Sequence, residues 1–186
     1  MSRTVKALYV GESETFAVAV EIGAREHNFI ADGIATDVSD FAEICVIPLR
    51  VNDLTEIGYT LLGNETSLTG TLKGNDNGEF ISLLSLDFSP LSVTLTSGEN
   101  SFTVDLQNVI EGKLSASDAV NVAEKEFAER ISSEISEQGA LKREIYVKLI
   151  TGDRENYYYY VSYIGEGMDY WAVLINPETG AVVSKK

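Results

Sequence analysis

The side chains most able to do chemistry in this sequence are one cysteine, one histidine and a run of four tyrosines. Cys45 is the only cysteine and His27 the only histidine in the 186 residues. A cysteine nucleophile needs a nearby base that stabilises its thiolate. Cys45 instead lies in the apolar run Ile44-Cys45-Val46-Ile47, a setting typical of a small buried hydrophobe. The sequence therefore favours a packing role for Cys45, with a nucleophile as the alternative.

The run from Tyr157 to Tyr160 predicts a strand with two tyrosines on each face. Successive side chains of a strand point to opposite faces, so two tyrosines can pack on a helix while two stand on the outer face. Tyrosine is a good strand former, and its polar tip tolerates half-burial. Sheet packing explains the run, and Tyr158, Tyr160 and Trp171 are the candidates for an exposed protein-contact surface.

Motifs for metal binding and catalysis are incomplete. The segment from Asn75 to Glu79 resembles a calcium loop, but Lys73 occupies the first carboxylate position and the distant glutamate ligand is missing. An Asn-Gly hairpin turn explains the same residues. His27 has no histidine or cysteine partner at zinc-binding spacing. The sequence contains neither a His-Glu-x-x-His nor a Gly-x-Ser-x-Gly motif. We therefore predict no metal, no cofactor and no enzymatic activity.

The composition is strongly acidic, with a net charge of −15. Residues 1–112 hold 17 acidic and 5 basic side chains, and residues 113–186 hold 12 and 9. Such a surface repels phosphate backbones and anionic lipids, so nucleic acid is not an expected partner. No apolar run approaches the roughly 18 residues of a membrane helix, so we expect no direct membrane insertion. The charge predicts solubility, with steering of a basic partner as the alternative.

Alternating apolar residues predict an all-β domain over residues 1–112, an antiparallel sandwich or a meander barrel. The clearest strand, Thr15–Ile22, places its larger apolar residues on one face. Further strands are predicted at Val5–Val10, Asn28–Ala31, Phe41–Pro48, Gly58–Leu62, Ser67–Lys73, Phe80–Phe88, Leu91–Thr96 and Phe102–Gln107. Residues 34–41 and 50–57 show no clear period and are expected to be loops.

Residues 113–186 predict an α+β domain, one helix packed on a small antiparallel sheet. Ser115 is a good N-cap, and Asp118 completes a capping-box pattern. Apolar residues at four-residue spacing form one helical stripe, consisting of Ala119, Ala123, Phe127, Ile131 and Ile135. Gly139 is placed to end the helix. Strands follow at Arg143–Ile150, Tyr157–Ile164, Tyr170–Ile175 and Ala181–Ser184, joined by turn residues.

Three features of this domain follow one another in a specific order. A helix opening, Leu114-Ser115-Ala116-Ser117-Asp118-Ala119, comes first. Two aromatic strands follow, with Tyr159-Val161-Tyr163 in one and Tyr170–Ile175 as the other. The turn Asn176-Pro177-Glu178-Thr179-Gly180-Ala181-Val182 ends the series. This order resembles the PepSY domain family, in which the last segment reads x-Pro-x-Thr-Gly-x-Val. The resemblance covers about residues 114–186, and residues 1–112 resemble no family.

The resemblance implies a non-catalytic module, found beside secreted peptidases and in cell-surface proteins and proposed to restrain or chaperone peptidases. We therefore expect a non-catalytic extracytoplasmic binding protein that engages a polypeptide or peptidase. Met1 to Lys6 runs directly into a strand pattern, so we expect no signal peptide in this chain. One alternative is a structural pair of domains in a surface-associated protein with no peptidase partner. The other is an unrecognised hydrolase in the β domain.

Overall fold

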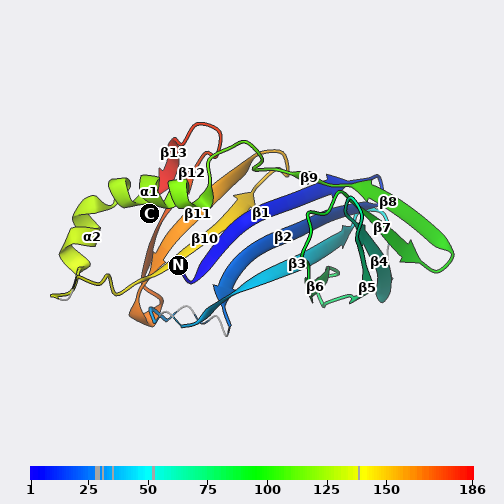
Figure 1. Cartoon of the computed structure of the whole chain (residues 1–186), viewed down its shortest axis with the longest axis horizontal. Coiled ribbons are helices and arrows are strands. Elements are labelled where there is room, and N and C mark those ends of the chain that lie inside the picture. Colours follow the sequence, from blue (N-terminus) through cyan, green and yellow to red (C-terminus); the bar gives the residue numbers. More distant parts are fainter. Residues whose placement is uncertain (28–29, 31, 35, 52, 138) are drawn as a thin grey trace. The chain divides into compact units, whose positions relative to one another are not determined.

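The computed structural model describes residues 1–27, 30, 32–34, 36–51, 53–137 and 139–186 (Figure 1). Two compact units are present, one formed by residues 1–6, 23–40 and 110–186 and the other by residues 7–22 and 41–109. We call them the terminal unit and the central unit. Three strands contribute residues to both units, namely β1 (Arg3–Glu12), β2 (Phe16–Glu26) and β3 (Val38–Pro48). The domain division between residues 112 and 113 stays a prediction.

The central unit is a β-sandwich. One of its sheets is antiparallel in the order β5-β4-β7-β8, formed by β5 (Ser67–Lys73), β4 (Glu56–Leu62), β7 (Ser92–Ser97) and β8 (Asn100–Asp105). The other sheet contains β1, β2 and β3. In it β6 (Phe80–Leu84) pairs with β3, and the short β9 (Gln107–Asn108) pairs with β1. Neither sheet closes on itself. The predicted all-β class is confirmed, and the sheets do not form a closed barrel.

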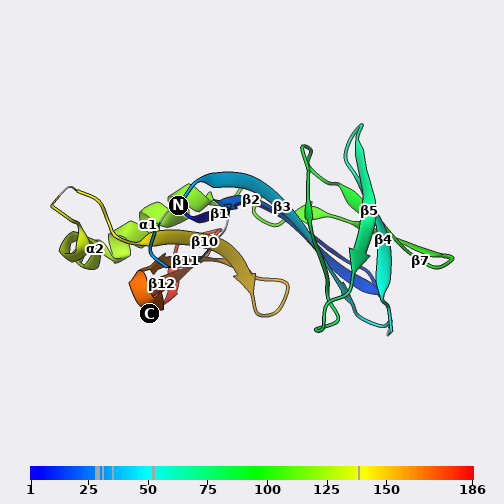
Figure 2. The same ribbon diagram turned by 90° about the horizontal axis from the view of Figure 1, so that it is seen from below.

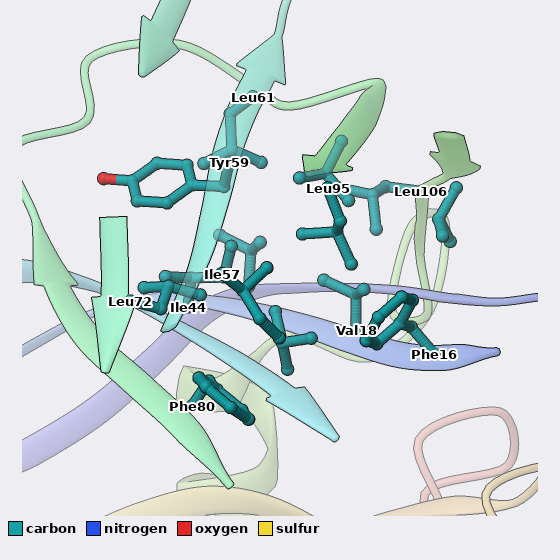
Figure 3. Packing of buried hydrophobic residues seen from close by; sticks show 14 residues of the cluster. Phe16, Val18, Ile44, Ile57, Tyr59, Leu61, Leu72, Phe80, Leu95 and Leu106 are labelled. Atoms are coloured by element: carbon teal, nitrogen blue, oxygen red, sulfur yellow. The ribbon is translucent and has the colours of Figure 1, made fainter. Parts of the chain in front are cut away.

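The core of the sandwich comes from the alternating apolar residues of both sheets (Figure 3). Phe16 and Val18 of β2 and Ile44 of β3 point toward Ile57 of β4 and Leu95 of β7. All five are at most 3% exposed. Burial of this much apolar surface is the main term that stabilises such a sandwich.

Several strand boundaries differ from the predicted ones. β3 begins at Val38 rather than at Phe41, and the side chains of residues 38–40 are exposed, so no alternation of buried and exposed residues marks this part of the strand. β4 begins at Glu56, inside a predicted loop. β6 ends at Leu84, and Phe88 packs against the core from outside any strand. Three of the four residues of the strand predicted at Asn28–Ala31 lie outside the described residues, and the fourth, Ile30, is not in a strand.

The terminal unit is an α+β structure in which α1 (Ala116–Glu126) lies against β11 (Tyr157–Ile164) and β12 (Tyr170–Ile175) (Figure 1). Its sheet continues antiparallel through β10 (Glu144–Thr151) on one side and β13 (Val182–Lys185) on the other. β10 also pairs with the start of β1 in parallel, with Arg3 opposite Tyr146. A short 3₁₀ turn, η1 (Glu166–Met168), connects β11 to β12. Figure 2 shows α1 on one side of this sheet.

The predicted capping box at the start of α1 is present. The Ser115 hydroxyl accepts the Asp118 backbone N–H at 3.1 Å, and the Asp118 carboxylate accepts the Ser115 N–H at 3.3 Å. Two of the backbone donors left open at this helix start are thereby satisfied.

The single predicted helix is instead divided into α1 and α2 (Ala128–Glu134) at Phe127. Ala123 and Phe127 of the predicted stripe are buried, but Ile135 is 47% exposed and extended. No described residue of α2 is buried, so packing adds little to its stability. Gly139, with φ of +78°, lies beyond the helix rather than ending it.

Candidate functional site

The four tyrosines of β11 are divided between the two faces of the terminal unit's sheet. Tyr159 is fully buried on the face that α1 covers, and its hydroxyl donates to the Leu114 carbonyl at 2.8 Å. Burial, with a smaller contribution from Asp118, raises the pKa of Tyr159 to about 12. Tyr158 and Tyr160 alternate onto the opposite face and are half-buried.

Trp171 lies on the covered face with Tyr159, away from Tyr158 and Tyr160. It pairs with Tyr163, and the two rings stack with centroids 4.2 Å apart. The Phe127 ring meets Trp171 edge-on at 4.5 Å. Trp171 is 3% exposed, so its expected place on an exposed contact surface is wrong. The reason is alternation along β12, because Trp171 points the same way as the buried Val173 and Ile175.

The opposite face carries tyrosines from β10, β11 and β12 and two lysines, one from β10 and one directly after β13. We call it the tyrosine–lysine face, and it consists of Tyr146, Lys148, Tyr158, Tyr160, Tyr170 and Lys186. Strand register brings these residues together, since Lys148 pairs with Tyr160. Tyr160 in turn pairs with Leu174 of β12. Tyr146, Lys148, Tyr170 and Lys186 were not among the predicted contact residues, although Tyr146 and Lys148 alternate with apolar residues of the same strand in the sequence.

The two lysines of this face lie over tyrosine rings. The Lys186 ammonium is 4.0 Å from the centroid of the Tyr170 ring and donates to the Tyr170 hydroxyl at 2.6 Å. The Lys148 ammonium is 5.9 Å from the Tyr146 centroid and 5.8 Å from that of Tyr160. A cation within about 6 Å of an aromatic face is attracted by the ring quadrupole, which restricts the lysine side chain.

A shallow groove of about 180 Å³ runs along β12 and β13 on this face. Its floor is largely apolar, with Ile150, Ala172 and Leu174 among the lining residues. Tyr160, Tyr170 and Lys186 place polar tips at its margin. Burial, with a smaller contribution from Tyr170, raises the pKa of the Tyr160 phenol, which stays protonated at neutral pH. The groove therefore offers phenol and ammonium donors beside an apolar floor.

Negative charge is nearly absent from this face although the chain is acidic. Of the described residues that alternate onto it along β10, β11 and β12, only Glu144 is a carboxylate, and it is 1% exposed. The nearby Asp169 is 2.8 Å from the Arg143 guanidinium, and Glu126 of α1 pairs with Lys185. The ammonium and phenol groups of this face therefore have little opposing side-chain charge beside them.

A comparison with protein-family models finds a match to PepSY, described as peptidase propeptide and YPEB domain. Residues 113–186 match this PepSY model. The match covers the C-terminal part of the chain, and residues 1–112 have no family match. No curated protein and no solved structure matches the chain. The resemblance expected from the sequence is thereby confirmed for this module, and PepSY implies a peptidase-related or regulatory role outside the cytoplasm.

The segments that carry the PepSY pattern hold one another in place. The Leu114 N–H donates to the Pro177 carbonyl at 2.8 Å, so the start of α1 is bonded to the final turn as well as to Tyr159. In that turn the Asn176 side chain accepts the N–H groups of Glu178 and Thr179 at 2.8 and 3.2 Å. Gly180 follows with φ of +69°, a conformation that favours glycine. These residues fix α1 across the sheet and leave the tyrosine–lysine face uncovered by it.

Cys45 is half-buried in β3, opposite Ile81 of β6. Burial, followed by the nearby carboxylates of Glu79 and Glu43, raises the pKa of its thiol to about 11. The thiol is therefore protonated at neutral pH, which disfavours the nucleophile alternative.

The other sequence candidates also have structural explanations. Asn75 accepts the N–H groups of Asn77 and Glu79 at 2.9 and 3.0 Å, within a turn between β5 and β6. These are the bonds of a turn in which an asparagine side chain caps the backbone. His27 is exposed at the end of β2. Within the described residues, no cluster of three or more histidine, cysteine or acidic side chains is arranged to hold a metal. Neither described helix is long and apolar enough to cross a membrane.

Two buried glutamates of the terminal unit escaped the sequence analysis. Glu26 and Glu144 are each 1% exposed. One Glu144 oxygen accepts three backbone N–H groups, from Asp32, Gly33 and Ile34, at 3.1, 2.6 and 2.9 Å. Burial, followed by repulsion from Glu26, raises the pKa of Glu144 even though these N–H groups oppose the shift. The pair anchors the segment after β2, and its burial makes it inaccessible to a substrate.

Proposed function

We propose that this protein is a non-catalytic, extracytoplasmic binding protein that engages a polypeptide, specifically a peptidase, through its PepSY module. The observation that supports this most directly is the open tyrosine–lysine face beside an edge strand in the residues that match PepSY. Tyrosine is enriched at protein interfaces because it combines apolar area with a polar tip.

The edge strand is β13, which lies at the end of its sheet with β12 as its neighbour among the described strands. All four of its side chains are exposed. Lys186 exchanges both backbone hydrogen bonds with Ala172. Because such pairs alternate in an antiparallel ladder, the N–H and C=O of Lys185 point away from β12. An added peptide strand can bond to these groups.

Titration into a thermolysin-like metalloprotease tests the peptidase version of this proposal. The expected result is a complex that co-elutes in gel filtration and a dose-dependent loss of peptidase activity. If neither complex nor inhibition is found, the peptidase version is wrong.

A pair of variants at Lys185 tests the edge itself. Lys185→Pro removes the backbone N–H that points away from β12, and Lys185→Ala keeps it. Both variants lose the ion pair with Glu126, so their difference isolates the backbone donor. Binding should weaken only in the proline variant, and equal binding by the two variants would contradict strand addition at β13.

A structural role without a peptidase partner is the second proposal. It is favoured by the passage of β1, β2 and β3 through both units, which links them by several continuous strands. Under this proposal the purified chain binds no peptidase or extended peptide, and both β13 variants behave like the wild type.

A further inference from the structure

We propose that the groove along β12 and β13 receives a carboxylate side chain of an extended acidic polypeptide, with Lys186 as its main partner. This inference rests on the proposed function and names the chemistry of the polypeptide that pairs with β13. The occupant is a segment with acidic side chains at alternate positions.

Tyr170 positions the Lys186 side chain. The Lys186 ammonium donates to the Tyr170 hydroxyl at 2.6 Å and lies 4.0 Å from the ring centroid, at the margin of the groove. An ammonium group has three donors, so two remain for an incoming oxygen. The Tyr170 side chain holds the lysine in place, which reduces the entropy lost when a ligand binds.

Three other lysines of the chain differ from the two on this face. Lys6, Lys113 and Lys185 each pair with a carboxylate, from Asp40, Glu178 and Glu126. In the part of the chain that the structure describes, Lys148 and Lys186 have tyrosine contacts and no carboxylate partner. The chain has 29 acidic and 14 basic side chains, so two such lysines on one face form a local positive site. An acidic segment is repelled by most of the surface and attracted here.

A strand added at β13 presents its side chains to the two faces of the sheet in turn. Alternate residues of a strand bonded to β13 point toward the groove, and the others point toward the α1 side. The groove side offers Lys186, the Tyr170 hydroxyl and an apolar floor that includes Leu174. On the α1 side, Lys185 already pairs with Glu126. Carboxylate recognition is therefore expected at every second position of the partner.

Two blocked peptides provide the test, one alternating threonine with glutamate and one alternating threonine with glutamine. Fluorescence anisotropy at low salt should give at least tenfold tighter binding for the glutamate peptide, because a charge-assisted hydrogen bond is about twice as strong as a neutral one. Added salt should remove most of this difference. Equal binding of the two peptides, or no binding of either, would overturn the inference.

Charge-matched variants locate the site. Lys186→Gln should weaken binding of the glutamate peptide about tenfold, because one hydrogen bond to a charged group is lost. Lys186→Gln should leave the affinity for the glutamine peptide unchanged. Lys125→Gln removes the same charge from the exposed surface of α1 and should change the affinity for neither peptide. If the two variants weaken the glutamate peptide equally, the groove is not the site.

The same measurements separate this inference from the proposed function. If the peptidase complex forms and is lost in Lys185→Pro, but the peptides show no preference for glutamate, polypeptide binding stands and the carboxylate inference is wrong. If the glutamate peptide binds through Lys186 but no peptidase complex forms, the carboxylate inference stands and the peptidase version is wrong.

Discussion

Replacement of Trp171 by alanine should be among the most destabilising single changes in the terminal unit, with a cost of about 3–5 kcal/mol. Trp171 is 3% exposed and contacts the rings of Tyr163 and Phe127 at centroid distances of 4.2 and 4.5 Å. An aromatic side chain buries about 200 Å², which at about 25 cal/mol per Å² corresponds to about 5 kcal/mol. This figure is an upper estimate because the unfolded chain already buries part of that area.

The neighbouring Tyr170 provides the matched control. It is 39% exposed and points to the opposite face, where its main partner is Lys186. Tyr170→Ala should therefore cost about 1 kcal/mol or less. Urea denaturation followed by far-ultraviolet circular dichroism gives both free energies of unfolding without a tryptophan signal.

Fluorescence of the wild type checks the same point independently, since Trp171 is the only tryptophan in the sequence. Its emission should be blue-shifted and weakly quenched by acrylamide in the native state. Equal destabilisation by Trp171→Ala and Tyr170→Ala, or strong acrylamide quenching, would refute this account of the two faces.

Three further predictions concern the contacts that hold the terminal unit together. Ser115→Ala should lower the free energy of unfolding by about 1 kcal/mol through loss of the cap, and Ser115→Asp should retain most of it; urea denaturation measures both. Tyr159→Phe should cost about 1 kcal/mol, because the Leu114 carbonyl loses its hydroxyl donor, and the same measurement applies. The pKa of Glu144 is raised, so the folded state holds a proton that the unfolded state releases above about 4.5. The free energy of unfolding should fall as pH rises from 4.5 through the higher folded-state pKa, and a series of urea titrations should show a smaller fall in Glu144→Gln.

The elements predicted best are those whose signal is local. β5, β11 and β12 have the predicted bounds, because turn residues flank a clear β pattern. The cap at Ser115 also follows from neighbouring residues alone. The helix end was missed because the apolar stripe continues to Ile135 in the sequence. In the structure Ser132 and Ser133 return hydrogen bonds to the backbone of α2, and this short helix lacks a buried face.

The candidate site was predicted only in part, because its faces depend on register. Tyr158 and Tyr160 follow from alternation within β11, but the residues beside them depend on the register between consecutive strands, which the turn residues alone do not fix. The buried position of Trp171 could have been predicted from Val173 and Ile175, which lie on the same face of β12. Together these two residues are more apolar than Tyr170, Ala172 and Leu174 on the other face. The parallel pairing of β1 with β10 joins residues more than a hundred positions apart and leaves no local pattern in the sequence.

The residues on which the resemblance to PepSY was recognised and those that form the open face are largely different sets, although both lie within residues 113–186. Leu114, Tyr159 and Pro177 are joined by internal hydrogen bonds, so their part in the pattern is explained by folding. Lys148 and Lys186 lie on the other face and are not needed for those bonds. The recognised residues are therefore explained by folding contacts, and under the proposed function the choice of partner depends on residues of the face. Variants of the face should accordingly change binding without changing stability, and variants of the pattern should do the reverse.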